Sequence, residues 1–291
     1  MSSAVVHDRP AEATMENSSE INLPELTESC ISAILSFTTP RDVCRLSAVS
    51  RLFTAAANGD SLWNKFIPQQ CYQILSRAVT PIEFASKREL YFRLCDSVLI
   101  DGGTQIFSLE RSTGKIEYML SATELSIAWG NDQHYWNWVS RNDSRFEVLA
   151  ELKYVWWFCV SGQIDCRLLS EDTQYRVVFV LKFAERSRDW TTLPINFSVT
   201  GPDEQERESR RVFIEMQRVH RDPIDHIFED AEWLEVVAGE FTLRANGNEG
   251  VTESSHMKCK FGMREVSRTR VKSGLFLDGV RIEPVNSSVG V

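Results

Sequence analysis

The spacing of apolar residues changes near Val98, and this change divides the chain into two kinds of structure. Before Val98, apolar side chains recur every three or four residues, which is the spacing of a helix that buries one face. After it, the spacing becomes two, as in a strand, and short apolar runs are separated by polar turns. We therefore predict an α+β protein with a small helical N-terminal domain and a larger antiparallel β-domain.

The apolar spacing and the capping residues predict four short helices within residues 21–68. The first is predicted from apolar residues at helical spacing, namely Leu26, Cys30, Ile34 and Phe37. Thr39 is the expected N-cap of the second helix, with Pro40 at its first helical position. Ser50 and Asp60 are the expected N-caps of the third and fourth helices. A bundle this small cannot enclose all its apolar surface, so we expect the remaining face to bind a partner.

Several short motifs follow one another in this segment. They are Leu23-Pro24, Ile34-Leu35, Pro40-Arg41-Asp42-Val43, Val49-Ser50-Arg51 and Leu62-Trp63. The segment resembles an F-box, which implies docking onto a Skp-type adaptor and, through it, onto a cullin in a ubiquitin ligase. By this resemblance, six apolar residues are the expected adaptor contacts: Leu23, Pro24, Ile31, Leu35, Val43 and Leu46. Helical spacing alone would favour the alternative, a helical subdomain packed on the rest of the chain.

The remaining boundaries follow from local patterns. Residues 1–20 are rich in Ser, Glu and Ala and are predicted to be disordered, and residues 286–291 form a tail. Residues 69–97 are predicted to be a helical connector, in which Ser86 caps a helix over Lys87–Cys95. Residues 98–285 are predicted to form an antiparallel β-sandwich of jelly-roll-like type, because several runs are apolar on both faces.

The strands of this β-domain are predicted from alternation and turn signals. Ser112-Thr113-Gly114-Lys115 indicates the turn of a hairpin between strands near residues 106–110 and 116–120. Further strands are expected in six runs: 152–164, 175–183, 195–200, 211–216, 233–241 and 275–283.

The composition excludes several classes of protein. With 43% hydrophobic and 25% charged residues in 291, the chain is typical of soluble globular proteins. A formal net charge of −9 argues against general nucleic-acid binding, which needs a basic surface. No apolar run reaches the length of a membrane helix, and no signal peptide is apparent, so no membrane partner is expected. The seven cysteines contain no Cys-x-x-Cys motif and the histidines no metal-ligand spacing. We therefore expect neither metal nor cofactor, and a reduced compartment, the cytoplasm or the nucleus.

Residues 119–138 combine aromatic and short polar side chains in a pattern typical of sugar sites. Indole rings stack on the apolar faces of pyranoses, and Asn, Asp, Gln and Glu bind their hydroxyl groups. Trp136 and Trp138 lie two residues apart and share one face of a strand. Trp129 precedes a turn at Gly130-Asn131-Asp132, so a carbohydrate site near these residues is one interpretation.

Five motifs mark this β-part: Asp101-Gly102-Gly103-Thr104, Ser126-Ile127-Ala128-Trp129-Gly130, Tyr135-Trp136-Asn137-Trp138, Phe213-Ile214-Glu215-Met216 and residues 233–241. By these motifs it is similar to the phloem protein 2 family, which includes plant nucleocytoplasmic lectins for N-acetylglucosamine-containing glycans. Together with the F-box, the chain resembles the F-box phloem-protein-2-like proteins of plants. The resemblance implies a lectin-type domain with four glycan-binding residues: Trp129, Trp136, Glu235 and Glu240.

Each of these residues also has a structural interpretation. A Trp in a β-sandwich is commonly part of the core, and this is the expectation for Trp138, Trp156 and Trp157. Glu235 and Glu240 can equally be outward-facing residues of an edge strand.

Three classes of function remain. The first is a substrate receptor of a ubiquitin ligase that captures a glycosylated or other protein target. The second is a lectin that acts without ligase assembly. The third, a glycoside hydrolase, needs two carboxyl groups roughly 5 to 9.5 Å apart. Glu235 and Glu240 are about 16 Å apart at the rise of a strand, on opposite faces unless Gly239 introduces a bulge. No Ser or Cys motif accompanies the histidines, so we expect no catalytic residue. The resemblance to the F-box implies that ubiquitin transfer belongs to other subunits.

Overall fold

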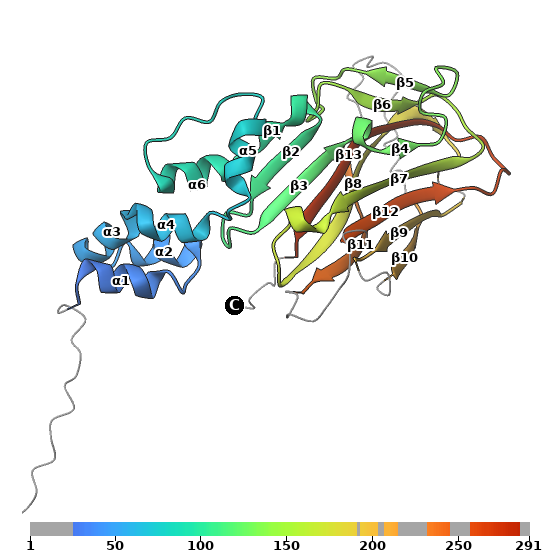
Figure 1. Ribbon diagram of the computed structural model, residues 1–291. Coiled ribbons are helices and arrows are strands. Elements are labelled where there is room, and N and C mark those ends of the chain that lie inside the picture. Colours follow the sequence, from blue (N-terminus) through green and yellow to red (C-terminus); the bar gives the residue numbers. More distant parts are fainter. Residues whose placement is uncertain (1–25, 191–192, 203–206, 215–231, 245–256, 286–291) are drawn as a thin grey trace, which may run out of the picture.

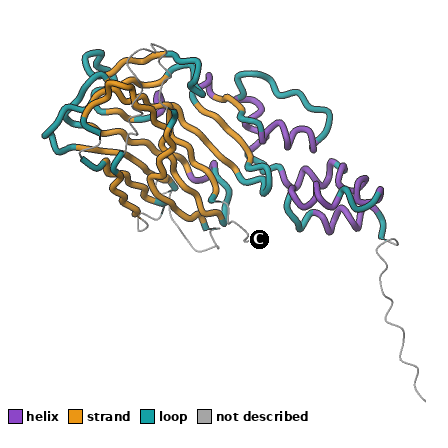
Figure 2. Tube along the Cα trace, turned by 180° about the vertical axis from the view of Figure 1, so that it is seen from behind, coloured by secondary structure: helices purple, strands orange, loops and turns teal. Residues whose placement is uncertain are grey.

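The computed structural model describes residues 26–190, 193–202, 207–214, 232–244 and 257–285. Helices gather at one end of the described chain and strands form the rest (Figures 1 and 2). Six α-helices come first: α1 (Glu28–Leu35), α2 (Pro40–Leu46), α3 (Arg51–Asn58), α4 (Asp60–Phe66), α5 (Cys71–Arg77) and α6 (Lys87–Cys95). The predicted disordered lead, the tail, and the expected adaptor contacts Leu23 and Pro24 lie outside the described residues.

Most helices begin where the sequence predicts, because the cap is a local hydrogen bond. Thr39 accepts from the Asp42 amide at 3.2 Å, and Ser50 accepts from the Phe53 amide at 3.3 Å. The prediction for Asp60 was wrong. Asp60 is the first residue of α4, and its carboxylate accepts from the Lys87 amide, 2.8 Å away at the start of α6. It therefore links the fourth helix to the connector.

Helix α6 packs between the four-helix bundle and the β-domain. The ring of Tyr91 lies 5.1 Å from that of Trp63 in α4. On the other side, the Tyr91 hydroxyl donates to the carbonyl of Arg111, 3.1 Å away in the first hairpin. Burial of the Tyr91 hydroxyl raises its pKa well above the usual range, so it stays a donor. The buried residues of the bundle, the connector and the sandwich form one connected cluster.

The strands form two open antiparallel sheets. In order they are β1 (Val98–Ile100), β2 (Gln105–Leu109), β3 (Ile116–Ser121), β4 (Ser126–Ile127), β5 (Trp136–Val139), β6 (Leu149–Leu152), β7 (Phe158–Asp165), β8 (Thr173–Arg188), β9 (Ile195–Thr200), β10 (Arg207–Val212), β11 (Leu234–Leu243), β12 (Lys258–Glu265) and β13 (Ser273–Pro284). Within the described ranges, one sheet has the order β1-β2-β3-β13-β6-β5, with β8 paired to β13 and β11 to β8. The other has the order β10-β9-β12-β7-β4.

The core lies between the two sheets, as the ring of Phe179 in β8 shows. It lies 5.4 Å from Phe197 of β9 and 6.1 Å from Phe261 of β12. The predicted β-sandwich and its first hairpin, β2–β3, are confirmed. The predicted run 152–164 is split into β6 and β7, because the chain between them crosses to pair with Lys272 through Val155. β12 was not among the predicted strands, although its apolar and charged residues alternate.

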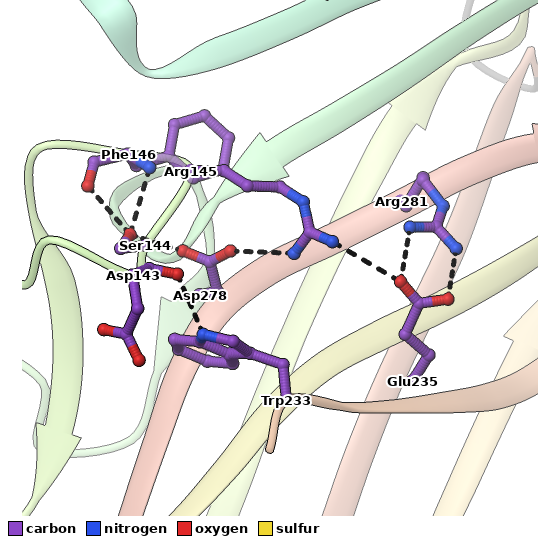
Figure 3. Close-up of polar contacts among 8 residues, drawn as sticks. All are labelled: Asp143, Ser144, Arg145, Phe146, Trp233, Glu235, Asp278 and Arg281. Atoms are coloured by element: carbon purple, nitrogen blue, oxygen red, sulfur yellow. Dashed lines mark hydrogen bonds and ion pairs between the residues drawn. The ribbon is translucent and has the colours of Figure 1, made fainter. Parts of the chain in front are cut away.

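The face of the larger sheet turned away from the core carries a second, smaller cluster. Phe146, from the loop between β5 and β6, packs there against Ile106, Met119 and Val180. Asp278, wholly buried where β13 shifts register, accepts from the Ser144 hydroxyl at 2.6 Å (Figure 3).

Asp143 of the same loop is held by two basic side chains. It accepts from Arg141 Nε at 2.9 Å and from Lys182 Nζ at 2.6 Å. These hydrogen bonds lower the pKa of Asp143 to about 2. Polar contacts thus fix this loop onto the sheet.

Candidate functional site

Trp129 is the exposed aromatic residue at the centre of the candidate site. It follows β4, and its side chain is 59% exposed. Its backbone has φ +65°, a left-handed conformation that is unusual for a residue with a large side chain. Its ring lies 5.7 Å from that of Tyr135. Trp129 lines two neighbouring hollows of the surface, which differ in chemistry.

The first is a polar hollow of about 580 Å³. Besides Trp129 it is lined by Ile127 and the following short polar segment, residues 130–134. The Asp132 carboxylate accepts from the His134 amide at 2.9 Å and contacts His134 Nδ1 at 2.8 Å. These hydrogen bonds lower the pKa of Asp132, so it is ionised at neutral pH and is a strong acceptor for hydroxyl groups.

The second is an aromatic hollow of about 640 Å³, which Trp129 also lines. Tyr135, Trp156, Trp157 and Arg268 line it, together with Ala128 and Val155. Trp156, Trp157 and Trp138 are 49%, 40% and 39% exposed, so the expectation that these three are core residues was wrong. Trp156 and Trp157 are consecutive, and neighbouring residues of an extended chain cannot both face the core. That simple consideration could have identified one of them from the sequence.

Trp136 is not a surface residue. Its side chain is only 1% exposed and packs against Phe158, with ring centroids 6.3 Å apart. The expectation that Trp136 binds a glycan directly is therefore wrong for this conformation, because β5 turns its side chain into the core.

Trp136 and Trp138 nevertheless position Trp129. The indole of Trp136 donates to the Ala128 carbonyl at 3.1 Å, and that of Trp138 donates to the Gly130 carbonyl at 3.0 Å. These carbonyls flank Trp129 on both sides. The two indoles therefore hold the turn whose left-handed residue is the exposed tryptophan.

Glu235 and Glu240 line neither hollow. A register shift between Val237 and Gly239 puts both on one face of β11, the face turned away from the core. Glu235 accepts two hydrogen bonds from Arg281, at 2.8 and 2.6 Å, and one from Arg145 at 3.5 Å (Figure 3). The hydrogen bond from Arg281 lowers the pKa of Glu235.

Glu240 accepts from the Gln174 amide at 2.6 Å. The four expected glycan-binding residues therefore do not form one group, and Trp129 is the one that lies at a surface hollow.

The expected adaptor contacts lie mostly inside the helical bundle. Ile31, Leu35 and Val43 are buried by this chain itself, and Leu46 is partly buried. The exposed apolar side chains of the bundle are different ones: Ile34 at 54%, Phe37 at 90% and Val49 at 66%. Helical spacing identified the helices, but it did not tell which residue of each stripe remains at the surface.

Comparison with known proteins agrees with this architecture. The F-box-like family model matches residues 28–69, and the Phloem protein 2 model matches residues 115–284, more than half of the chain. The chain belongs to the phloem protein 2 family and carries an F-box. This F-box phloem protein 2 chain is 34% identical to the Arabidopsis thaliana F-box protein PP2-B15 over 284 residues, 89% of this chain and 96% of that protein.

Two further relatives span a similar share of the chain. The Arabidopsis thaliana F-box protein PP2-B10 is 34% identical over 260 residues, covering 88% of this F-box phloem protein 2 chain and 92% of the relative. F-box protein VBF from the same plant is 30% identical over 288 residues, covering 89% and 98%. Among solved structures, the TmCBM61 complex with β-1,4-galactotriose aligns at 14% identity over 57% of this chain and 91% of the other, with a TM-score of 0.32. A similarity that small supports no argument.

In the described ranges, no group of three His, Cys, Asp or Glu side chains could hold a metal ion. Likewise, no described helix is long and apolar enough to cross a membrane. The arrangement around Trp129 is suited to binding through aromatic stacking and hydrogen bonds.

Proposed function

We propose that this chain is the substrate-recognition subunit of an SCF-type ubiquitin ligase. The F-box would bind a Skp-type adaptor and, through it, a cullin. The β-domain would bind a glycosylated protein target at Trp129. The match to the F-box supports the adaptor half of the proposal, which is binding to the Skp-type adaptor. The exposed Trp129, which lines both a polar and an aromatic hollow, carries the glycan half, which is binding of the glycosylated target.

The exposed apolar residues of the bundle support the adaptor half. Ile34 and Phe37 lie three positions apart at the end of α1, and both are more exposed than buried. Interface affinity concentrates in a few apolar anchors that become buried on binding. We propose these two side chains as anchors, in place of Ile31, Leu35 and Val43, whose burial leaves them to hold the bundle together.

Co-precipitation with a purified Skp-type adaptor tests this assignment. Ile34→Asp combined with Phe37→Asp should abolish capture of the adaptor, because each change puts a charge at the proposed interface. Val266→Asp, at a half-exposed apolar residue of the β-domain, is the matched control and should leave capture unchanged. Circular dichroism confirms that each variant is folded. Full capture by the double variant would reject these anchors.

The glycan half rests on the two-sided environment of Trp129. A pyranose ring can stack on the indole, while its hydroxyl groups reach Asn131, Asp132 and Gln133 in the polar hollow. N-acetylglucosamine-containing glycans are the proposed ligands, because the family resemblance includes the motif that carries Trp129. By analogy with base–aromatic stacking, one such ring contributes about 1 to 3 kcal/mol.

Calorimetric titration with N-acetylglucosamine oligomers tests the glycan half. Trp129→Ala should weaken binding about tenfold or more, since 1.4 kcal/mol corresponds to a factor of ten. Phe213→Ala removes a similarly exposed aromatic ring, 58% exposed and away from both hollows, and should have no effect. If the unmodified chain binds no glycan, the glycan half is wrong, and a protein epitope is the better assignment. Glycan binding without adaptor binding would instead favour a lectin that acts alone.

We further propose that the protein acts in the cytoplasm or the nucleus. All seven cysteines are free thiols, which supports a reducing compartment. A fluorescent fusion that entered the secretory pathway would contradict this proposal.

A further inference from the structure

Two residues with a strained backbone line the aromatic hollow. Five described residues other than glycine have a positive φ: Asp101, Trp129, Asp172, Asp189 and Arg268. Three are aspartates, which tolerate the left-handed conformation well. The other two, Trp129 at +65° and Arg268 at +57°, both line the aromatic hollow. Such positions persist only where the surroundings hold them, and they cluster at binding sites.

Arg268 differs from the neighbouring Arg270 in that it pairs with no carboxylate of the described residues. Arg270 forms an ion pair with Asp189 at 3.2 Å. In the part of the chain that the structure describes, Arg268 forms no such pair, and its guanidinium carbon lies 4.6 Å from the centre of the Trp157 ring. Stacking on an aromatic face leaves the N–H edge of a guanidinium free to donate.

The two walls of the hollow are joined by one buried ion pair. Lys272 pairs with Glu265, and both side chains are almost fully buried. The Lys272 ammonium also donates to the carbonyl of Trp156 at 2.7 Å and to that of Arg270 at 3.1 Å. The segment that carries Trp156 and the segment that carries Arg268 are thus tied to one cation.

Glu265 fixes the turn that leads to Arg268. It accepts from the Ser267 amide at 2.9 Å. Its burial raises its pKa, but hydrogen bonds from Lys272 and Ser267 outweigh this and leave the pKa below its usual value, so Glu265 stays ionised. The hollow is therefore organised before any ligand arrives, which reduces the entropic cost of binding.

We propose that the aromatic hollow binds a sugar ring that bears an anionic group, a carboxylate or a sulfate, with Arg268 pairing with the anion and the tryptophans stacking on the ring. The proposal rests on the glycan half of the proposed function and adds the chemical class of the ligand. A guanidinium edge matches the geometry of both anions and can bind them through two hydrogen bonds. The volume of about 640 Å³ lies in the range of small-ligand sites.

The two hollows also give the bound glycan a direction. The polar hollow is lined by Asp132, whose negative charge disfavours an anion there, whereas Arg268 attracts one in the aromatic hollow. An oligosaccharide that spans both hollows would place its acidic unit against Arg268 and a neutral unit against Asp132.

Titration of the full chain with matched glycan pairs tests the inference. One pair is the tetrasaccharide of alternating glucuronic acid and N-acetylglucosamine, and its carboxyl-reduced counterpart. The other is a 6-sulfated N-acetylglucosamine oligomer and its desulfated counterpart. At low salt, the acidic member of at least one pair should bind about tenfold more tightly, and the preference should decrease as salt rises. The pair that shows the preference identifies the anion.

Two variants assign the preference to one side chain. Arg268→Asn keeps a residue that accepts a positive φ but removes the charge, so it should abolish the preference for the acidic member of the pair. Arg270→Asn removes the same charge two residues away, outside the hollow, and should retain the preference. Equal binding of acidic and neutral glycans, or a preference that survives Arg268→Asn, would overturn the inference while leaving the glycan function intact.

Two other outcomes would also contradict the glycan function on which the inference rests. If neither member of either pair binds, the glycan function itself fails, and the inference fails with it. If an acidic peptide binds through Arg268 and no glycan does, the hollow belongs to a protein epitope, and the proposal of a sugar ligand is wrong.

Discussion

Replacing either of two tryptophans seven residues apart by alanine should have opposite consequences. Trp136 is 1% exposed and packs in the core, whereas Trp129 is 59% exposed and lines the hollows. Trp136→Ala should therefore reduce stability, and Trp129→Ala should reduce glycan binding. A protein in which both tryptophans bound the ligand would show the second effect for both variants.

The size of the stability loss follows from the burial of Trp136. Truncating a buried Trp to Ala costs about 3 to 5 kcal/mol, since a cavity remains. For a cooperative unit of 150 to 250 residues, about 1 kcal/mol shifts the melting temperature by roughly 2 to 4 °C. The expected decrease for Trp136→Ala is therefore about 6 to 20 °C. Trp129→Ala removes an exposed side chain, a change of about 0.5 kcal/mol or less, so its melting temperature should fall by no more than about 2 °C.

Thermal unfolding followed by circular dichroism, with glycan titration at 15 °C, separates the two effects. Trp136→Phe serves as a control, because it keeps an aromatic ring in the core and should recover much of the lost stability. The reasoning is refuted if Trp136→Ala melts like the unmodified chain but binds no glycan. It is also refuted if Trp129→Ala melts as low as Trp136→Ala.

Three further predictions concern stability. Lys272→Ala leaves Glu265 buried without its cation, which should lower the free energy of unfolding by about 3 to 5 kcal/mol. Urea unfolding measures this loss, and an unchanged midpoint would contradict the buried pair. Asp143 has a pKa lowered to about 2 by its basic partners, against about 3.9 in an unfolded chain. Its contribution to stability is therefore complete above about pH 5 and is lost as the pH falls toward 2. The melting temperature of the unmodified chain should fall over this range, and the pH profile of Asp143→Asn should be flatter. A fragment of residues 70–285 retains α5 and α6, whereas one of residues 98–285 lacks both. The longer fragment should melt at the higher temperature, because α6 covers the first hairpin. Equal melting temperatures would show that the connector adds no stability.

The sequence predicted those elements whose cause is local. Thr39, Ser50 and Ser86 begin helices because each hydroxyl accepts from an amide three residues later. Asp60 could not be assigned in this way, because its partner, the Lys87 amide, is 27 positions away. The strands followed from alternation, but their bounds depend on pairing, as the interruption at Val155 shows.

The candidate site was predicted only in part, because the positions of its side chains also depend on contacts that are distant in the sequence. Trp129 was found because it precedes a short polar turn. Trp136 was placed wrongly, because whether a strand residue faces the core or solvent depends on the sheet it joins. Arg268 carries no signal in the sequence: its importance arises from a stacking contact with Trp157, which lies more than a hundred residues earlier.

In the proposed function, one chain binds a glycan and an adaptor at the same time. The most direct measurement is retention of a purified Skp-type adaptor on a resin that carries N-acetylglucosamine oligomers. The adaptor should be retained only when the chain is added, and free oligomer should release both. Retention should be lost with Trp129→Ala, which disrupts the glycan side, and with Ile34→Asp/Phe37→Asp, which disrupts the adaptor side. If the chain binds the resin and separately binds the adaptor, but never retains the adaptor on the resin, the proposed receptor function is contradicted.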